Sequence, residues 1–262
     1  MTGAGANGNG TPPGDAQVPA PKVLGREAPR PLPKRFYQTA TVGEANGAFS
    51  VLLDGRPVKT PAKRDLALPN RALAELVAAE FAAQGATIDP ATMPVTRIVN
   101  SALDGVAPRH AEVAEDLAAY AGSDLVCYRA DAPDGLIARQ ARHWDPVVVW
   151  AARELGVRPA LATGVIHVAQ PPALGEATLA RLASLDAISL AAMHVVTTLT
   201  GSALLALALA AGALDASEVW AAAHVDEDWQ VEQWGEDGEA TARRAARRTE
   251  FDAACRILAA FR

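Results

Sequence analysis

The sequence predicts an α+β fold in which a small antiparallel β-meander with a covering helix is followed by a mostly α-helical domain. β-branched and aromatic residues with tight-turn signals are confined to residues 35–68. Helical patterns separated by Gly and Pro follow residue 90, and residues 187–214 contain no Asp, Glu, Lys or Arg. Because strands precede helices instead of alternating with them, the pattern favours an α+β arrangement over a parallel α/β sheet.

The net charge argues against a nucleic-acid partner, and the cysteine spacing argues against a zinc site and a disulfide framework. The chain has 262 residues, a net charge of -6 and a pI near 5.4, which disfavours a general nucleic-acid binder. A local basic cluster is expected to be a solvated helix face paired with Glu236, Glu239 and Glu250. That cluster consists of Arg243, Arg244, Arg247 and Arg248. The two cysteines have no metal-binding or redox spacing, so we expect neither a zinc site nor a disulfide framework.

Composition divides the chain into three parts. Residues 1–34 are rich in Gly, Pro and Ala and are expected to form a disordered or extended arm. A G-x-G-x-x-G match within this arm has no preceding strand and no following helix, so it does not indicate a dinucleotide site. We expect an α+β domain at residues 35–90 and a helical domain at residues 91–262.

The first domain is expected to contain four strands and one helix. The strands are predicted at residues 35–42, 48–53, 56–60 and 65–68, with a turn at 43–47. Asp54-Gly55 is a strong tight-turn signal because both residues tolerate positive φ. Asn70 is expected to cap a helix that runs to about Gln84 and stops at Gly85.

The second domain is expected to be built around the apolar run at residues 187–214. Helical patterns cover 94–106, 109–121, 134–155, 175–183, 186–212 and 216–260. The apolar run is long enough to cross a bilayer, which needs roughly 20 residues. Ser, Thr and Gly interrupt it, and its flanks are acidic, so a buried central helix is favoured over a membrane anchor. His194 within it is expected to be a hydrogen-bonded core residue.

No catalytic signature is present in the sequence. It contains no P-loop, no G-x-S-x-G elbow and no H-E-x-x-H motif, so enzyme activity and a cofactor are not indicated. One alternative is a metal-dependent enzyme using His224, Asp228 and Glu232, which lie at helical i, i+4 and i+8 positions. Metal sites normally draw their ligands from several elements, so this alternative is not favoured and no metal is expected.

The segment at residues 226–237 has the most distinctive composition of the chain. It carries six carboxylates and two Trp but no basic residue, and it follows a capping box formed by Asp215 and Glu218. One stripe of this helix carries Glu227, Gln230, Val231 and Trp234. Trp is enriched among interface anchors and charge selects partners, so the stripe suggests a protein-docking surface. The alternative is that both Trp pack in the core beneath a solvated acidic face.

Short motifs lie in order between residues 35 and 235. They are Arg35-Phe36-Tyr37, Leu53-Asp54-Gly55-Arg56-Pro57, Ala79-Glu80-Phe81, Met93-Pro94-Val95-Thr96, Trp144-Asp145-Pro146 and Asp228-Trp229-Gln230-Val231-Glu232-Gln233-Trp234-Gly235. In this order they resemble the assembly chaperones of the F-type ATP synthase that bind the alpha subunit of its catalytic sector. Phe81 departs from the family pattern, which has Trp after the glutamate, so any hydrogen bond of an indole N–H is lost here.

The resemblance implies a chaperone without known enzyme activity that holds unassembled alpha subunit, independently of ATP, and prevents its aggregation. It also implies a functional acidic residue in the helical domain. Glu227 is the first candidate for partner binding, followed by Gln230, Trp234 and Glu232. We expect a monomer without stable membrane insertion. Abundant Ala and an excess of Arg over Lys suggest a bacterial, cytoplasmic protein, with relatives in the mitochondrial matrix.

Overall fold

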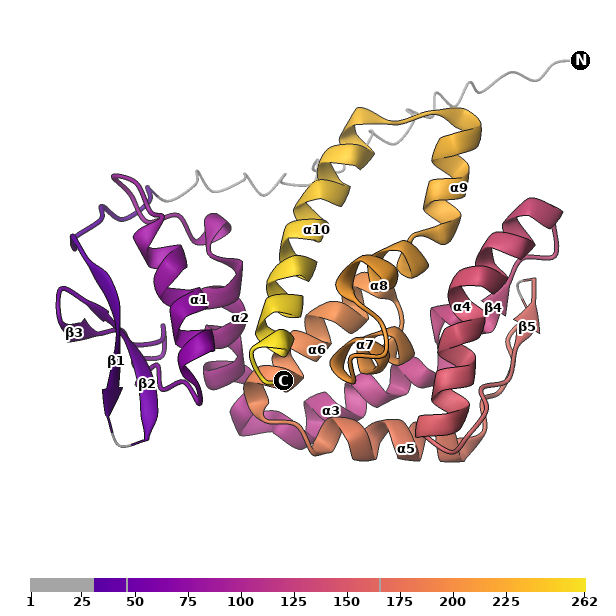
Figure 1. The fold of residues 1–262 in the computed structure, drawn as a ribbon, viewed down its shortest axis with the longest axis horizontal. Coiled ribbons are helices and arrows are strands. Elements are labelled where there is room, and N and C mark those ends of the chain that lie inside the picture. The colour runs from indigo at the N-terminus through magenta and orange to yellow at the C-terminus, as the bar shows by residue number, and fades with distance from the viewer. Residues whose placement is uncertain (1–30, 46, 165) are drawn as a thin grey trace, which may run out of the picture. The chain divides into compact units, whose positions relative to one another are not determined.

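The computed structural model describes residues 31–45, 47–164 and 166–262, and residues 32–262 form one compact unit. A small sheet and its helix come first along this unit, and helices follow (Figure 1). The α+β prediction is confirmed. The predicted arm lies almost entirely outside the described residues, and the domain boundary near residue 90 stays a prediction.

The sheet has three antiparallel strands in the order β1-β2-β3. β1 (Ala40–Ala45) pairs with β2 (Ala48–Leu53), which also pairs with the two-residue β3 (Arg56–Pro57). Asp54 and Gly55 have φ angles of 49° and 79°, which confirms the predicted tight turn. Residues 65–68 were predicted as a strand but make isolated bridges alone.

The first strand begins later than predicted, and Asp54 explains the difference. The carboxylate of Asp54 accepts hydrogen bonds from the backbone N–H groups of Gln38 and Thr39, at 3.1 and 2.8 Å. These two N–H groups are therefore occupied by a side chain and do not donate to a neighbouring strand. The same hydrogen bonds hold the pKa of Asp54 below its usual value.

Helix α1 (Arg71–Ala82) lies against the sheet, with the apolar side chains of Leu73 and Val77 fully buried. The Asn70 side chain accepts from the N–H of Leu73 at 2.9 Å, which confirms the predicted cap. The predicted stop at Gly85 is wrong, because the helix already ends at Ala82. The Gln84 side chain donates to the backbone carbonyl of Glu80 and accepts from the backbone N–H of Asp89. These two hydrogen bonds pair backbone groups at the end of α1 and in the loop that follows it.

Phe81, the departure from the family pattern, keeps an aromatic contact. Its ring packs edge-on against Tyr37, with ring centroids 6.0 Å apart, and its backbone carbonyl accepts the Tyr37 hydroxyl at 2.8 Å. The hydrogen bond between these residues therefore uses the backbone of Phe81 and needs no indole.

The following helices agree with the predicted ranges within a few residues. They are α2 (Pro94–Ser101), a π-helical turn (Ala102–Val106), α3 (His110–Ala119), α4 (Asp134–Glu154) and α5 (Pro172–Ala183). Short 3-10 turns occur at Pro90–Thr92, Ala107–Arg109, Tyr120–Ser123 and Leu125–Cys127. Two-residue strands β4 (Tyr128–Arg129) and β5 (Ala162–Thr163) pair in parallel beside α4 (Figure 1).

The apolar run forms two helices, so the prediction of a single central helix is wrong. α6 (Ala187–Thr200) ends at Gly201, whose φ of 69° is left-handed, and α7 (Ala203–Ala210) begins with Ser202 accepting from Leu205 N. Both helices are largely buried. No helix in the described ranges is long and apolar enough to span a bilayer, and the continuous 187–214 helix that the membrane-anchor alternative requires does not form.

His194 is not a core residue, contrary to prediction. Its side chain is exposed on the surface of α6, on the side that turns toward the π-helical turn and α3. The periodicity of α6 accounts for this, because the helix buries Ala191 and Val196 but leaves one narrow stripe uncovered.

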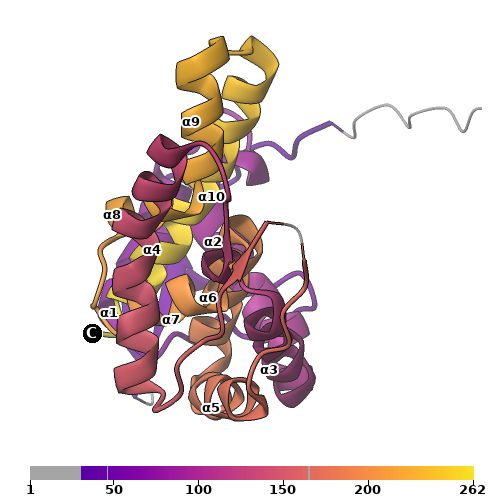
Figure 2. The ribbon, with the colours of Figure 1, turned by 90° about the vertical axis from the view of Figure 1, so that its right-hand side faces the viewer.

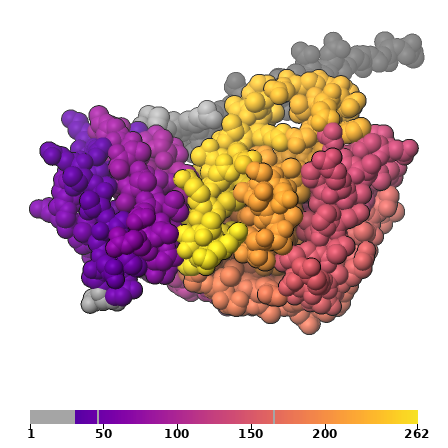
Figure 3. Space-filling view, in the orientation of Figure 1, coloured from indigo at the N-terminus to yellow at the C-terminus, as the bar shows by residue number. Residues whose placement is uncertain are grey.

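The predicted helix at 216–260 is also divided. Its parts are α8 (Ala216–Ala223), α9 (Val225–Trp234) and α10 (Gly238–Ala259). The capping box of Asp215 and Glu218 is confirmed. Gly235, with a φ of 86°, ends α9, and the Asp237 side chain caps α10. α9 and the first half of α10 form a helical hairpin, seen in both ribbon views and in the space-filling view (Figures 1, 2 and 3).

Candidate protein-docking surface

Helix α9 is held in place by polar contacts with α4. The Arg139 guanidinium donates to both carboxylate oxygens of Glu232, at 2.8 and 2.7 Å. Six residues earlier on α9, Asp226 accepts from the Gln140 amide at 2.7 Å. The Arg139 contact lowers the pKa of Glu232 and raises that of Arg139. These bonds position α9 along α4 in a defined register.

Trp229 strengthens the contact between α9 and α4. The Arg139 guanidinium lies 5.4 Å from the centre of the Trp229 ring, within cation–π range. A Cβ atom added at Gly135 would lie 2.6 Å from this ring, so glycine permits the close approach. Trp229 is half-buried by these contacts and acts as the anchor of α9 on α4. For Trp229, packing within the protein is therefore a better interpretation than a place on the docking surface.

The other side of α9 faces α10 across a groove of about 510 Å³. One wall carries the predicted stripe of Glu227, Gln230, Val231 and Trp234, and the opposite wall carries Arg243, Arg244 and Arg247. We call this the α9–α10 groove. The Trp234 side chain is 79% exposed, so it does not pack into the core. An uncovered indole beside a polar groove is typical of an interface anchor.

The two walls of the groove have opposite charge. Asp228 and Arg244 form an ion pair of 2.5 Å that bridges α9 and α10. Glu227 lies 4.0 Å from Arg247, which is a loose contact, and its side chain is 55% exposed. The carboxylate of Glu227 is therefore available to a partner, whereas that of Asp228 is engaged within the chain.

His224 lies behind Glu227 at the junction of α8 and α9. It is 1% exposed, its Nδ1 lies 2.8 Å from the Trp220 carbonyl, and its Nε2 has no hydrogen bond within the described residues. Nε2 is 3.8 Å from the Glu227 carboxylate. Burial lowers the pKa of His224, so the ring is neutral at pH 7.

The metal-site alternative is wrong. His224 is buried under α8, Asp228 pairs with Arg244, and Glu232 pairs with Arg139, so the three side chains point to different partners. Within residues 31–45, 47–164 and 166–262, no group of three His, Cys, Asp or Glu side chains could hold a metal ion. The three residues are equally spaced in sequence, but their side chains do not converge on one position where a metal ion could bind.

Three of the four predicted site residues lie together, and the fourth does not. Glu227, Gln230 and Trp234 line the α9–α10 groove, whereas Glu232 faces α4. The arginines of α10 were not foreseen as part of the site. Arg243 pairs with Glu239 as a solvated face would, but Arg244 and Arg247 cross to α9. A basic row following an acidic run could have indicated this hairpin.

These features indicate which chemistry the α9–α10 groove can supply. An α+β fold presents an exposed Trp and an uncommitted carboxylate on a helical hairpin, and the described groups around them offer recognition chemistry and no ligand set for a metal. Such a surface is chemically suited to binding another protein.

Comparison with known proteins identifies the family. The profile of the ATP12 chaperone protein family matches residues 34–152. The crystal structure of Atp12 from Paracoccus denitrificans is 42% identical, with a TM-score of 0.83 over 88% of this chain and 99% of that chain. The Atu1473 protein of Agrobacterium tumefaciens, described as a chaperone, is 48% identical, with a TM-score of 0.84 over 91% and 93% of the two chains.

A eukaryotic relative extends the match. The mitochondrial protein atp12 of Schizosaccharomyces pombe is 23% identical over 219 residues, which are 79% of this chain and 75% of that protein. The chain belongs to the ATP12 chaperone family, whose members are assembly chaperones of the ATP synthase. The resemblance found in the sequence is confirmed at this level. Assembly chaperones are not an enzyme class.

Proposed function

We propose that the protein is an ATP-independent chaperone that binds the unassembled alpha subunit of the F-type ATP synthase and prevents its aggregation. The observation that carries this proposal is the α9–α10 groove, where the exposed Trp234 lies one turn from Gln230 and on the same stripe as Glu227. Membership of the ATP12 chaperone family supports the connection with ATP synthase assembly.

The groove has the chemistry that a reversible partner surface needs. An unassembled subunit exposes an interface that would otherwise aggregate, and covering it requires apolar contact together with charge complementarity. Trp234 and Val231 supply the apolar contact, and Glu227 supplies an accessible negative charge. Gln230 can donate and accept hydrogen bonds at the rim.

The proposed activity requires no nucleotide hydrolysis, because the beta subunit can displace the chaperone by binding the same interface more tightly. Capture of alpha subunit is expected to be unchanged when ATP is replaced by a non-hydrolysable analogue.

We also propose that the protein acts as a monomer in the bacterial cytoplasm, without enzymatic turnover. Light scattering would test the oligomeric state, and cell fractionation would test the location.

The first test is Glu227→Lys. This change places a positive charge beside Arg247 and removes the accessible carboxylate, so affinity for purified alpha subunit should fall by about tenfold or more, measured by calorimetry. Trp234→Ala should also weaken binding by at least about tenfold. Because both side chains are exposed, the thermal unfolding temperature should change little in either variant.

Glu176→Lys is the matched control, since Glu176 is exposed on α5 and has no hydrogen bond or ion pair among the described residues. An aspartate-to-lysine mutant of Atp12p from P. denitrificans has the same fold as this chain, with a TM-score of 0.83. An acidic residue of a relative can therefore be replaced by lysine without loss of fold. Equal affinities of Glu227→Lys and Glu176→Lys would remove Glu227 from the site.

A further inference from the structure

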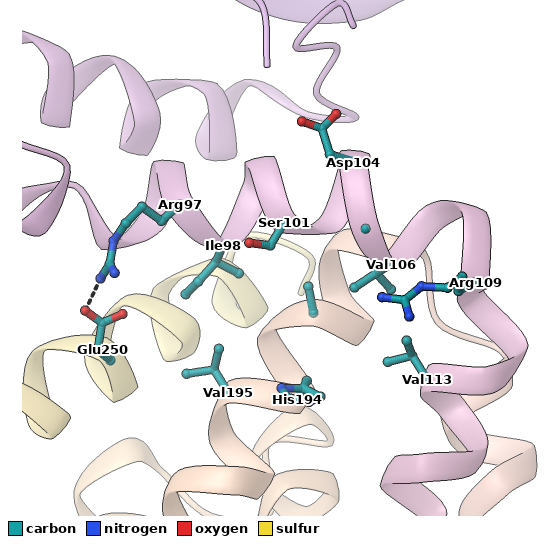
Figure 4. Close-up of a pocket in the computed structure, with 12 residues that line it drawn as sticks. Arg97, Ile98, Ser101, Asp104, Val106, Arg109, Val113, His194, Val195 and Glu250 are labelled. Atoms are coloured by element: carbon teal, nitrogen blue, oxygen red, sulfur yellow. Dashed lines mark hydrogen bonds and ion pairs between the residues drawn. The ribbon is translucent and has the colours of Figure 1, made fainter. Parts of the chain in front are cut away.

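A second groove, of about 640 Å³, lies outside the α9–α10 groove. It is bordered by α2, the π-helical turn, α3, α6 and α10, and Figure 4 shows its side chains. Its apolar lining consists of Ile98, Val106, Val113, Ala191 and Val195. We call it the α3–α6 groove. π-helical turns occur frequently at functional sites, and here the turn forms one wall.

The acidic side chains of the α3–α6 groove are occupied within the chain. Asp104 accepts from the Thr60 hydroxyl at 2.7 Å and from the backbone N–H of Ala62 at 3.0 Å. Glu250 is paired with Arg97, as the dashed line in Figure 4 marks. Both carboxylates are therefore engaged within the chain and leave little negative charge free in the groove.

Two nitrogen-bearing side chains at the α3–α6 groove have no hydrogen-bond or ion-pair partner among the described residues. Arg109 is exposed, and its guanidinium has no hydrogen bond or ion pair within the described part of the chain. Figure 4 shows it lying between Val106 and Val113. The exposed His194 ring also lines the groove and has no hydrogen bond to any described residue. The groove thus combines an apolar floor with a free cation, on a chain whose net charge is -6.

Helix α10 borders both the α3–α6 groove and the α9–α10 groove. Arg247 lines the α9–α10 groove and donates from its guanidinium to the Leu199 carbonyl of α6, at 2.7 Å. Glu250 follows Arg247 by one turn of α10, and Val195 precedes Leu199 by one turn of α6; both line the α3–α6 groove. One extended partner could therefore contact both grooves across the α6–α10 pair.

We propose that the α3–α6 groove is a second docking site for the same protein partner, taking a segment in which an aliphatic side chain neighbours a carboxylate. The aliphatic group covers the valines of the floor, and the carboxylate pairs with Arg109. Val106, Val113 and Val195 are half-buried, so the floor is open and suits a segment lying across the surface better than an enclosed fatty acid. This inference rests on the proposed function, since it takes the alpha subunit as the partner.

The first test measures affinity for purified alpha subunit in variants of Arg109. Arg109→Gln removes the charge and should weaken binding about tenfold, Arg109→Glu should weaken it further, and Arg109→Lys should retain most of the affinity. Folding is not at risk from Arg109→Glu, because an acidic residue at the start of α3 is favoured by the helix dipole. Arg158→Glu, at an exposed arginine outside both grooves, is the matched control.

The outcomes separate the two proposals. If the wild-type protein does not bind alpha subunit, the proposed function fails. If the wild type binds and Arg109→Glu binds as well as Arg158→Glu, the second docking site alone is overturned. A loss in Arg109→Glu that Arg109→Lys shares in full would overturn the carboxylate pairing.

A photo-crosslinking amino acid in place of Ser101 provides an independent measurement. Ser101 is exposed and lines the α3–α6 groove, so the probe samples whatever occupies it. Mass spectrometry of the complex with alpha subunit should identify a partner peptide with an aliphatic residue next to Asp or Glu. Crosslinks confined to a second copy of this chain, to its own N-terminal residues, or to no protein would contradict the proposal.

Discussion

Asp124 is a fully buried carboxyl group where the loop after α3 meets the start of α7. It accepts from the Ser202 hydroxyl at 2.6 Å and from the N–H groups of Leu204 and Val126, at 3.0 and 3.2 Å. Burial nevertheless raises its pKa from 3.8 to about 6, because desolvation of the charge outweighs the hydrogen bonds. A single residue therefore makes the stability of the molecule depend on pH.

The direction of this dependence follows from proton linkage. Between pH 3.8 and about 6 the folded state binds more protons at Asp124 than the unfolded state, so its contribution to stability falls as pH rises through this window. From pH 5 to pH 7 the loss should be about 1 kcal/mol. The lowered pKa of His224 acts in the opposite sense, since it removes stability as pH falls below 6.5.

Comparison of the wild type with Asp124→Asn isolates the carboxyl group, because His224 is present in both proteins. The difference between their free energies of unfolding should change by about 1 kcal/mol between pH 5 and pH 7, with Asp124→Asn gaining relative stability at the higher pH. Urea denaturation at both pH values measures it. Parallel pH profiles of the two proteins would show that Asp124 has an ordinary pKa.

At the scale of elements, Gly201 decides how the apolar run is divided. Its left-handed φ of 69° ends α6, and its N–H donates to the carbonyl of Thr197 at 2.8 Å. Ser202 then starts α7 with its side chain as the cap. The chain changes direction within two residues, so a segment long enough to span a bilayer becomes two short, buried helices.

Gly201→Ala should lower the free energy of unfolding by about 1 kcal/mol, because a Cβ atom is strained at this φ. Guanidinium denaturation provides the measurement. Gly85→Ala is the matched control: Gly85 is exposed, has open space around its Cα and lacks a left-handed φ, so this change should cost little. Equal destabilisation by the two substitutions would argue against strain at Gly201 as the cause.

At the scale of the whole molecule, a buried carboxylate joins the sheet region to the helices. Glu80 on α1 accepts from the N–H groups of Val95 and Thr96 at 2.8 and 2.7 Å, and from the Thr96 hydroxyl at 2.7 Å. Asn70 donates to the Ala260 carbonyl near the C-terminus. These contacts cross the predicted boundary near residue 90, so the two regions should unfold together.

Two probes test this cooperativity. All five Trp lie in the helical region, at residues 144 to 234, so fluorescence reports that region whereas circular dichroism reports the whole chain. Their denaturation midpoints should coincide. Glu80→Ala should lower the free energy of unfolding by about 2 to 3 kcal/mol, since it leaves two buried N–H groups unpaired, and Glu80→Gln should lower it less. Separate midpoints in the wild type would indicate two independently folding domains.

Local signals predicted most of the elements correctly. Asn70 and Asp215 cap helices because their side chains satisfy N–H groups within three residues, an interaction that needs no distant partner. The exposed side of α9 was foreseen in the same way, from the spacing of Glu227, Gln230 and Trp234. Glu232 does not lie with the other partner-binding candidates, because the position of its side chain depends on Arg139, which is 93 residues away in sequence.

The sequence by itself determined the order of strands and helices, the helix caps, the family and the stripe on α9, since each depends on residues close together along the chain. Tertiary structure alone decided that Arg244 and Arg247 face α9, that Glu232 is bound by α4, and that Arg109 and His194 meet at one groove. These arrangements arise from the packing of helices distant in sequence. Periodicity assigns a face to each side chain but cannot specify which neighbour covers it.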